Sequence, residues 1–351
     1  MKQLNLTGNN VVLYDDLNQE SVMVRIPKFR LSDVIDGAPD LVHPAFIVDG
    51  EEKECIYISK YQNVVRSERA CSLPGEDPAV LYSIEEAERF CRNKGKGWHL
   101  MTSAEWAAIA LWCLKNETLP RGNNDGGKAW DKPHEHGTVV SLHGVVPEGE
   151  EGPPMRVGCG SGPASWSHDG TLAGIFDLNG NIWEMTAGLR LHDGVLECVA
   201  DNDAARYTLE SAPWSQICAD DLTLKESGDR ALSMTEGAKE EGVRFTAAEM
   251  RKKDANQEIL APFSELTWET DLCESGNLLQ QLCLIPSGDA GHHTDAGWAV
   301  TEGVRYPIRG GYWVNREMAG ILAYGFYMQA EDRYFDVGFR CCYIEESEES
   351  L

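Results

Sequence analysis

Helical periodicity in this 351-residue chain is strongest in two neighbouring segments. Ser83 precedes IEEAERFCRNKG, in which Glu86 is the third residue after the cap and Gly95 closes the segment, the pattern of a capped helix. Ser103 precedes AEWAAIALWCLKN, in which apolar residues recur at helical spacing. We therefore predict two helices, each with its own cap, separated by a short loop at residues 95–102.

Short strands are predicted on both sides of these helices. Residues 10–30 contain VVLYDD and SVMVRIPKF around a polar turn, and the strand-like segments FIVDG and CIYISKY follow from His43. Residues 119–170 are rich in Gly, Pro, Asn and His and lack periodicity, which predicts long ordered loops. GVLECVA at residues 194–200 and the C-terminal residues return to short strands. This order indicates an α+β fold of two helices, short antiparallel strands and long ordered loops, in which the first and last strands could pair.

The composition divides the chain into three parts. Residues 1–36 are predicted to form N-terminal strands or an arm, residues 37–344 one domain, and residues 345–351 an acidic tail. Within the domain, the polar residues 201–262 are predicted to be an insertion on a compact frame, with one helical piece, AAEMRKK.

The chain is strongly acidic, with a formal net charge of -26. Such a surface repels phosphate groups, so nucleic acid and anionic membranes are poor partners, and a monomer is favoured over an oligomer. No segment has the apolar length of a membrane helix, and Met1–Asn10 lacks the basic and apolar regions of a signal peptide. The sequence therefore predicts a protein made in the cytoplasm, with assembly on a virion as a further hypothesis.

Four segments resemble, in the same order, the signature of the formylglycine-generating-enzyme (sulfatase-modifying factor) branch of C-type-lectin folds. They are Trp98–Trp106 (WHLMTSAEW, like RLPTEAEW in the family), Asp177–Thr186 (DLNGNIWEMT, like DMxGNVWEWT), Arg309–Trp313 (RGGYW, like RGGSW) and Val337–Arg340 (VGFR, like GFR). The resemblance spans residues 43–344 and implies a C-type-lectin-like fold.

Several residues of these motifs have physical roles that do not depend on the family. Asn179-Gly180-Asn181 can supply the left-handed conformations of a tight turn, and Gly310-Gly311 lacks Cβ atoms where two backbones pass closely. Trp183 is expected to bury its ring. Arg309 and Arg340 are expected to pair with carboxylates or carbonyls inside the loops, with Glu184 and Glu105 as candidate carboxylates.

The resemblance also implies a structural calcium ion in the second motif. Two carboxylates and backbone carbonyls form a set of oxygen ligands that suits calcium. The alternative is that Glu184 is satisfied by backbone N–H groups or by an arginine. No other cofactor is expected. The implied calcium ligands are Asp177, Gly180, Ile182 and Glu184.

Catalysis is not expected, and no catalytic residue is predicted. The family's enzymes need a copper-binding cysteine pair shortly after RGGSW, and the corresponding stretch Val314–Leu322 contains no cysteine. Cys341-Cys342 lies beyond the GFR motif and is predicted to fill the core. The histidine clusters His134-Glu135-His136 and His292-His293 show no third ligand at a useful spacing. The alternatives are an oxidase like the formylglycine-generating enzyme, another metal-dependent enzyme with an unrecognised site, and a sugar-binding lectin, although the lectin tripeptides Glu-Pro-Asn and Gln-Pro-Asp do not occur.

The C-terminal residues 306–343 hold ten aromatic residues and no lysine. Surfaces rich in tyrosine with scattered Arg and Asp are typical of antibody-like binding sites. Consecutive side chains on a strand point in opposite directions, so the aromatic residues of Tyr324–Tyr327 and Arg333–Asp336 cannot all face one core. We predict here a surface that binds a protein ligand or a cell-surface receptor.

This layout resembles the variable protein of a diversity-generating retroelement, whose variable region lies between RGG and GFR. In such systems the adenines of template asparagine codons are randomised, which reaches most amino acids but never Trp, Met, Lys, Gln or Glu. The resemblance implies a variable region at about residues 309–340, with frame residues such as Trp313 and Met328 inside it. The predicted ligand-binding residues are Tyr312, Val314, Asn315, Arg316, Tyr324, Phe326, Tyr327, Asp332, Arg333, Tyr334, Phe335 and Asp336.

The eleven cysteines have no metal-binding spacing and are predicted to be reduced and buried, with one or two disulfides as the alternative. Thiol titration of the denatured, unreduced protein is expected to find most of the eleven free. A titration that finds most of them in disulfides would overturn both the cytoplasmic and the non-redox interpretations.

Overall fold

The computed structural model describes residues 9–141, 155–226, 230–236, 243–247, 258–268, 275–287 and 294–346. Over these residues the chain consists of short helices and mostly antiparallel strands, so the predicted α+β class is confirmed. Residues 248–253 of the predicted helical piece and residues 347–351 of the predicted acidic tail lie outside the described residues.

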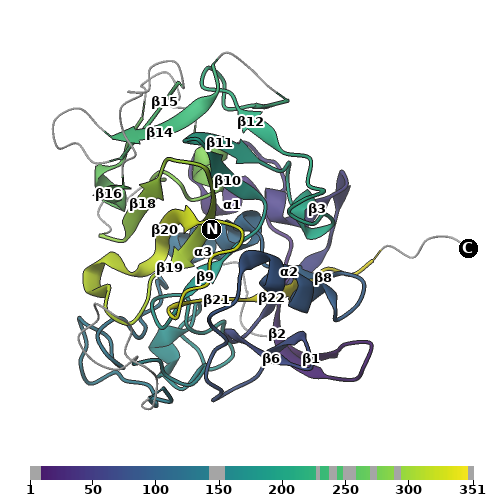
Figure 1. Cartoon of the computed structure of the whole chain (residues 1–351), viewed down its shortest axis with the longest axis vertical. Coiled ribbons are helices and arrows are strands. Elements are labelled where there is room, and N and C mark those ends of the chain that lie inside the picture. Colours follow the sequence, from purple (N-terminus) through teal and green to yellow (C-terminus); the bar gives the residue numbers. More distant parts are fainter. Residues whose placement is uncertain are drawn as a thin grey trace, which may run out of the picture.

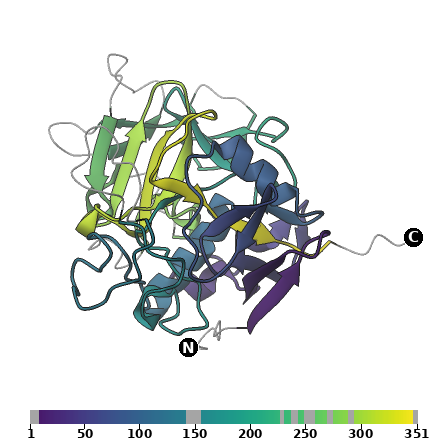
Figure 2. The same ribbon diagram turned by 60° about the horizontal axis from the view of Figure 1, so that its bottom comes forward.

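A five-stranded sheet brings the two ends of the chain together. Its strand order is β1 (Asn9–Tyr14), β2 (Glu20–Pro27), β5 (Cys55–Ser59), β22 (Cys341–Tyr343) and β8 (Trp98–Leu100). The C-terminal strand β22 lies between β5 and β8 and is antiparallel to both. Figure 2 shows the purple N-terminal strands close to the yellow strand near the C-terminus. Val24 and Ile26 of β2 are fully buried, so the predicted N-terminal arm contributes to the core.

Helix α2 (Ile84–Arg92) begins where the sequence predicts it. The Ser83 hydroxyl accepts a hydrogen bond from the Glu86 N–H, and the Glu86 carboxylate accepts one from the Ser83 N–H. Two donors at the start of the helix are thereby satisfied. Gly95, just after the helix, has a φ of 114°, a conformation that side chains with a Cβ rarely adopt.

Helix α3 (Ser103–Asn116) lies in the middle of the core. Its cap is Thr102, which forms the reciprocal pair with Glu105, so the prediction of Ser103 as the cap is wrong by one residue. Residues 103–113 are all buried, and the apolar ones form one hydrophobic cluster with residues of β2, β5 and β20 (Gly320–Met328). Burial on all sides is typical of a helix that other elements enclose.

A larger sheet contains most of the strands after residue 183. Its main path is β16 (Glu258–Pro262), β18 (Ala296–Val300), β20, β19 (Val304–Gly310), β10 (Leu189–His192), β11 (Val195–Cys198), β14 (Leu232–Glu236), β15 (Val243–Ala247) and β17 (Thr267–Trp268). The strands β9 (Trp183–Met185), β12 (Ser215–Ile217), β13 (Leu224–Lys225) and β21 (Val337–Phe339) pair off this path. Strands of the predicted insertion extend the sheet, and Figure 1 shows β12, β14 and β15 at the top of the molecule.

The remaining elements are short. They are α1 (Leu31–Val34), α4 (Leu278–Gln281), the pair β3 (Ile47–Val48) and β4 (Glu51–Glu52), and the pair β6 (Asn63–Arg66) and β7 (Arg69–Ser72). Between α3 and residue 163 the described residues form loops with isolated β-bridges, as their lack of periodicity predicts. In the described part of the chain, no helix combines the length and the apolar character needed to cross a lipid bilayer.

Replacing Trp183 and Tyr334 tests which aromatic rings stabilise the fold. Trp183 is 3% exposed and packs in a core cluster, whereas Tyr334 is half-buried at the edge of the same cluster. Trp183→Ala is expected to lower the free energy of unfolding by about 3–5 kcal/mol, because it leaves a cavity. Tyr334→Ala is expected to lower it by about 1 kcal/mol. Chemical denaturation measures both values, and equal large losses would contradict this division into core and surface rings.

Candidate functional site

The four sequence motifs meet in one layer of the structure. Strand β9 pairs antiparallel with β19, with Arg309 opposite Glu184, and parallel with β21. The segment before α3 joins this layer, because the Met101 N–H donates to the Arg340 carbonyl at 2.9 Å. Figure 1 shows β9, β19 and β21 together near the centre of the molecule.

Glu184 and Arg340 form a buried ion pair within this layer. The guanidinium donates from Nε and Nη2 to the two carboxylate oxygens at 2.8 and 2.7 Å. It also donates to the carbonyls of Ser59 and Phe176 at 2.8 and 2.9 Å. A buried pair is tolerated only when its other donors and acceptors are satisfied, and these contacts satisfy the guanidinium. The expected pairing of Arg340 with Glu184 is confirmed.

Gln62 occupies the position that the resemblance implies for calcium. Its amide nitrogen donates to the Ile182 carbonyl at 3.2 Å and to the Glu184 carboxylate at 3.0 Å, two groups of the implied calcium site. The Glu184 carboxylate therefore already accepts hydrogen bonds from neighbouring side chains, as the alternative to a metal ion predicts. Calcium at Asp177, Gly180, Ile182 and Glu184 stays a prediction that requires Gln62 to move away.

The Asp177 side chain is buried beside this network. Its Oδ2 accepts a hydrogen bond from the Gly160 N–H at 2.7 Å, and its Oδ1 has no partner within the described residues. Burial raises the pKa of Asp177 to about 7, against the opposing effects of the Gly160 N–H and the Arg340 charge. Between about pH 4 and about pH 7 the folded chain therefore keeps a proton on Asp177 that the unfolded chain has lost. The free energy of unfolding that depends on this group falls as the pH rises through that range.

Arg309 is buried, and no ion pair joins it to a carboxylate of the described residues. Its guanidinium lies 5.9 Å from the centre of the Trp106 ring and 5.7 Å from that of Tyr324. Its Nε and Nη2 have no hydrogen-bond partner among the described residues, and burial lowers the pKa of Arg309 to about 10. The prediction that it pairs with Glu184 or Glu105 is wrong, because both carboxylates pair with other side chains.

The loop Gly311–Ala319 carries the first part of the predicted ligand-binding set. Gly311 has a φ of 84°, and a Cβ atom there would lie 2.6 Å from the Ala319 Cβ. Val314 and Met318 are 45% and 40% exposed, and the exposed Arg316 has a left-handed φ of 52°. Strained backbone at exposed residues is typical of binding loops.

Strand β20 divides the next aromatic residues between core and surface. Tyr324 and Phe326 are fully buried in the cluster that contains α3, whereas Tyr327 points to the other face and is half-buried. The prediction that Tyr324 and Phe326 contact a ligand at the surface is therefore wrong. The physical reason is the alternation of side chains along a strand, which sends residues 324 and 326 to the same buried face.

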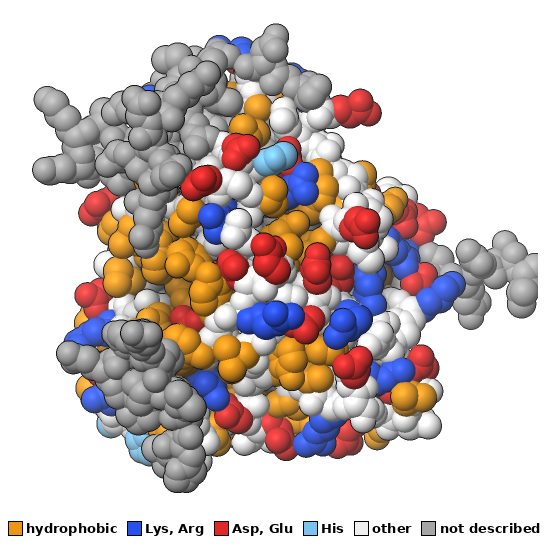
Figure 3. Space-filling view, viewed as in Figure 1, with side chains coloured by type: hydrophobic (Ala, Val, Ile, Leu, Met, Phe, Trp, Pro, Cys, Tyr) orange, Lys and Arg blue, Asp and Glu red, His pale blue; other side chains and the backbone are white. Residues whose placement is uncertain are grey.

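Five half-buried rings, which we call the aromatic surface, lie in two groups of contacts. They are Trp298, Tyr312, Tyr327, Tyr334 and Phe335. The ring centroids of Trp298 and Tyr327 are 5.8 Å apart, and those of Tyr327 and Tyr334 are 5.5 Å apart. The buried Trp313 ring lies 5.1 Å from Tyr312 and 5.7 Å from Phe335, so these two rings form a second group around Trp313. Figure 3 shows hydrophobic side chains gathered on the face where β18, β19 and β20 lie.

Polar groups surround these rings. The Tyr334 hydroxyl donates to the Asp332 carboxylate at 3.2 Å, and burial together with the Asp332 charge raises the pKa of Tyr334. The exposed Arg333 donates to Glu86 at 2.9 Å. This contact, together with the hydrogen bond from the Ser83 N–H, lowers the pKa of the Glu86 carboxylate. The predicted ligand-binding residues that are exposed or half-buried are Tyr312, Val314, Asn315, Arg316, Tyr327, Asp332, Arg333, Tyr334, Phe335 and Asp336.

Sequence reasoning missed two residues of this region. Leu81 is 56% exposed, has a left-handed φ of 65°, and donates its N–H to the Tyr334 carbonyl at 3.0 Å. Trp298 lies on β18, which is parallel to β20 and places Trp298 opposite Gly325. Both lie outside residues 309–340, and no local pattern in the sequence indicates which strand β18 pairs with.

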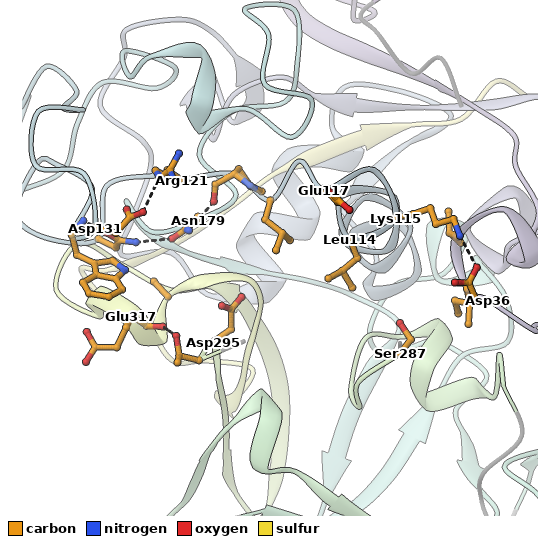
Figure 4. A pocket seen from close by; sticks show the side chains of 18 residues that line it. Asp36, Leu114, Lys115, Glu117, Arg121, Asp131, Asn179, Ser287, Asp295 and Glu317 are labelled. Carbon is orange, nitrogen blue, oxygen red and sulfur yellow. Dashed lines mark hydrogen bonds and ion pairs between the residues drawn. The ribbon is translucent and has the colours of Figure 1, made fainter. Parts of the chain in front are cut away.

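A cavity of about 820 Å³ adjoins the loop Gly311–Ala319. Glu317 of the loop contributes to its wall, as do Leu114, Lys115 and Glu117 at the end of α3. Figure 4 shows these side chains together with Asp295, which lies between them on the segment before β18.

The basic groups of this cavity are already neutralised. Lys115 contacts Asp36 at 2.6 Å, and Arg121 contacts Asp131 at 2.8 Å, as the dashed lines of Figure 4 show. Burial raises the pKa of Asp295 to about 7. The remaining carboxylates leave the cavity acidic, so it suits a cationic group better than an anionic one.

The cysteines and histidines that the enzyme alternatives would use differ in burial. Ten cysteines are free and buried, and Cys273 lies outside the described residues. Burial raises the pKa of Cys283 to about 12, so this thiol is protonated at neutral pH. His134 and His136 are exposed on a loop, and His292-His293 lies outside the described residues.

Comparison with known proteins adds little to this geometry. No family model matches the chain, and no curated protein matches it. Among solved structures, that of PvdO from Pseudomonas aeruginosa is similar, with 13% sequence identity, 95% of this chain and 98% of that chain covered, and a TM-score of 0.33. A likeness of this size carries no argument about function. The fold and the site define an α+β protein with a half-buried aromatic surface beside an acidic cavity.

Arg309 and Arg340 are both buried and are expected to respond differently to replacement by methionine. Arg340→Met leaves Glu184 as an uncompensated buried charge, so we expect a loss of about 3–5 kcal/mol in the free energy of unfolding. Arg309→Met removes two unpartnered donors and keeps an apolar side chain of similar length, so we expect a change of less than about 1.5 kcal/mol. Urea denaturation of both variants measures the difference, and a larger loss for Arg309→Met would contradict the assignment.

Proposed function

We propose that this chain has a C-type-lectin-like fold of the formylglycine-generating-enzyme type and is a non-catalytic ligand-binding protein. Its C-terminal surface would be diversified, as in the variable protein of a diversity-generating retroelement. The proposal for the fold is supported by the order of the four motifs and by their meeting in one layer around Glu184 and Arg340. The aromatic surface is the observation that carries the proposed function.

The aromatic surface has the composition of a protein-binding site. Tyrosine and tryptophan offer a large contact area and a hydrogen-bonding group, and they lose little rotamer entropy when they bind. Such rings, together with arginine, supply most of the energy at known interfaces. Arg333 and Arg316 are exposed within the predicted binding set, so both types of anchor are present.

The residues that the retroelement hypothesis treats as constant are in part the residues that the structure buries. Trp313 and Met328, which randomised asparagine codons cannot encode, are 3% and 0% exposed. Glu317 and Met318 cannot be encoded either, but they are exposed, so they would be constant residues of the surface. Tyr324 and Phe326 can be encoded but are buried, so we now assign them to the frame.

The proposed ligand is a protein or a cell-surface receptor. The net charge of -26 disfavours nucleic acid as the ligand. The absence of a cysteine from Val314–Leu322 and the burial of the described thiols support a function without catalysis.

A triple variant, Tyr327→Ser with Arg333→Ser and Tyr334→Ser, tests the surface. Serine is among the residues that the codon scheme can reach, so the fold is expected to tolerate all three changes. Tyr324→Ser is the matched control, because it removes an aromatic ring of the same strand from the core. We expect Tyr324→Ser to cost about 3–5 kcal/mol of stability and the triple variant to cost less. The triple variant should weaken binding to the natural partner by about 100-fold or more.

Thermal and chemical unfolding with circular dichroism measure the first outcome, and surface plasmon resonance measures the second. An unfolded triple variant would show that these rings belong to the core. A folded triple variant that binds at full strength would show that the ligand contacts another surface. Sequencing of the DNA beside the gene is an independent check, since a reverse-transcriptase gene and an imperfect repeat of codons 309–340 are expected there.

A further inference from the structure

Three side chains with different metal-binding atoms meet inside the core, apart from the residues of the aromatic surface. Within the described residues, His99, Glu105 and Cys342 bring a nitrogen, an oxygen and a sulfur atom within 4.8 Å of one another. His99 on β8 and Cys342 on β22 are directly opposite in an antiparallel pair, and Glu105 is in the first turn of α3. All three are buried, at 1%, 0% and 0% exposure.

The hydrogen bonds of His99 define where its lone pair lies. Nδ1 is 2.9 Å from the Gly97 carbonyl oxygen, which only accepts, so Nδ1 carries a proton. In a neutral ring the lone pair is then on Nε2, which faces the Glu105 Oε1 at 2.9 Å. Two lone pairs at this distance repel each other, so a proton or a metal ion must lie between them. Metal-binding histidines are typically held by a backbone carbonyl at the other ring nitrogen in this way.

The Glu105 carboxylate is held in place by further donors. Its Oε2 accepts a hydrogen bond from the Thr102 N–H at 3.0 Å, and its Oε1 accepts one from the Asn202 amide at 3.1 Å. Burial raises the pKa of Glu105, but the charge of His99 and these hydrogen bonds outweigh it, so the net pKa is below the ordinary value. Burial and the nearby carboxylate raise the pKa of Cys342, which therefore stays a thiol in the metal-free protein.

We propose that His99, Glu105 and Cys342 form a structural site for a divalent metal ion of the zinc type. Binding replaces two protons, one on Nε2 of the imidazolium and one on the Cys342 thiol, and both are released to solvent. The ion is then held by a neutral imidazole, a carboxylate and a thiolate, so its two positive charges balance two negative ligands. No oxidant or reductant takes part.

The donor set selects the class of metal. Nitrogen, sulfur and carboxylate ligands together are typical of zinc, whereas calcium and magnesium take oxygen ligands. Ligand atoms at about 2.0–2.1 Å from a tetrahedral zinc ion lie about 3.3 Å apart. The His99–Glu105 distance of 2.9 Å therefore has to widen by about 0.4 Å, and the Cys342 sulfur, which lies within 4.8 Å of both atoms, completes the set by side-chain rotation.

A metal ion here would connect the last strand, β22, to β8 and the start of α3, which lie far from β22 in the sequence. The site is enclosed, so the ion has to enter while the chain folds. Its expected effect is therefore on stability, and it does not depend on the function proposed for the aromatic surface.

The full chain, produced without a histidine tag in medium containing Zn²⁺, provides the test. Elemental analysis of the purified protein is expected to find about one zinc ion per chain. Cys342→Ser and His99→Gln are expected to reduce the zinc content at least about fivefold. Cys341→Ser is the matched control, because Cys341 is the adjacent buried thiol but is not part of the cluster, and it should keep the full zinc content.

Protein grown with Co²⁺ instead of Zn²⁺ gives a second measurement. A thiolate-to-cobalt charge-transfer band in the near ultraviolet is expected for the parent chain and for Cys341→Ser, and it should be missing for Cys342→Ser. Circular dichroism shows whether each variant is folded. Folded parent protein without zinc or cobalt, or equal metal contents in the Cys341 and Cys342 variants, would show that a shared proton joins His99 to Glu105 and would overturn the proposal.

Discussion

The buried ion pair of Glu184 and Arg340 ties together more of the chain than any local interaction does. It connects β9 to the segment before β22, and the same guanidinium reaches the carbonyls of Ser59 and Phe176. Removing either partner would leave a charge in a place without water, which costs far more than the intact pair contributes. The loops of this layer are therefore restricted to arrangements in which every one of these donors finds its acceptor, and Gln62 completes the set.

The proposed binding surface lies next to tightly packed rings of the core. Strand β20 sends Tyr324 and Phe326 into the cluster around α3 and Tyr327 to the outside. Trp313 is buried under Tyr312 and Phe335 in the same manner. Surface rings can change without loss of the fold only if the rings beneath them keep their positions, and the alternation of the strand separates the two groups.

The segment before α3 shows how a single histidine sets the chemistry of a buried site. An arginine beside a buried carboxylate is charged at every ordinary pH, whereas a histidine is not. His99 lies next to Glu105 and has to acquire a proton or a metal ion to balance the carboxylate. Cys342 lies opposite His99 on β22 and supplies a third ligand atom. A metal ion can therefore take the place of the proton between His99 and Glu105.

The sequence by itself determined the elements whose signals are local: the Ser83 cap of α2, the extent of α3 within one residue, the loops after it, and the turn glycines Gly180 and Gly311. Caps, periodicity and left-handed backbone are properties of neighbouring residues, so they can be read directly. Only the tertiary structure decided that Tyr324 is buried, that Arg309 forms no ion pair with a described carboxylate, and where Trp298, Leu81 and Cys342 lie. These depend on which strand pairs with which and on the register of that pairing. Contacts between residues far apart in the chain set both, and no local pattern records them.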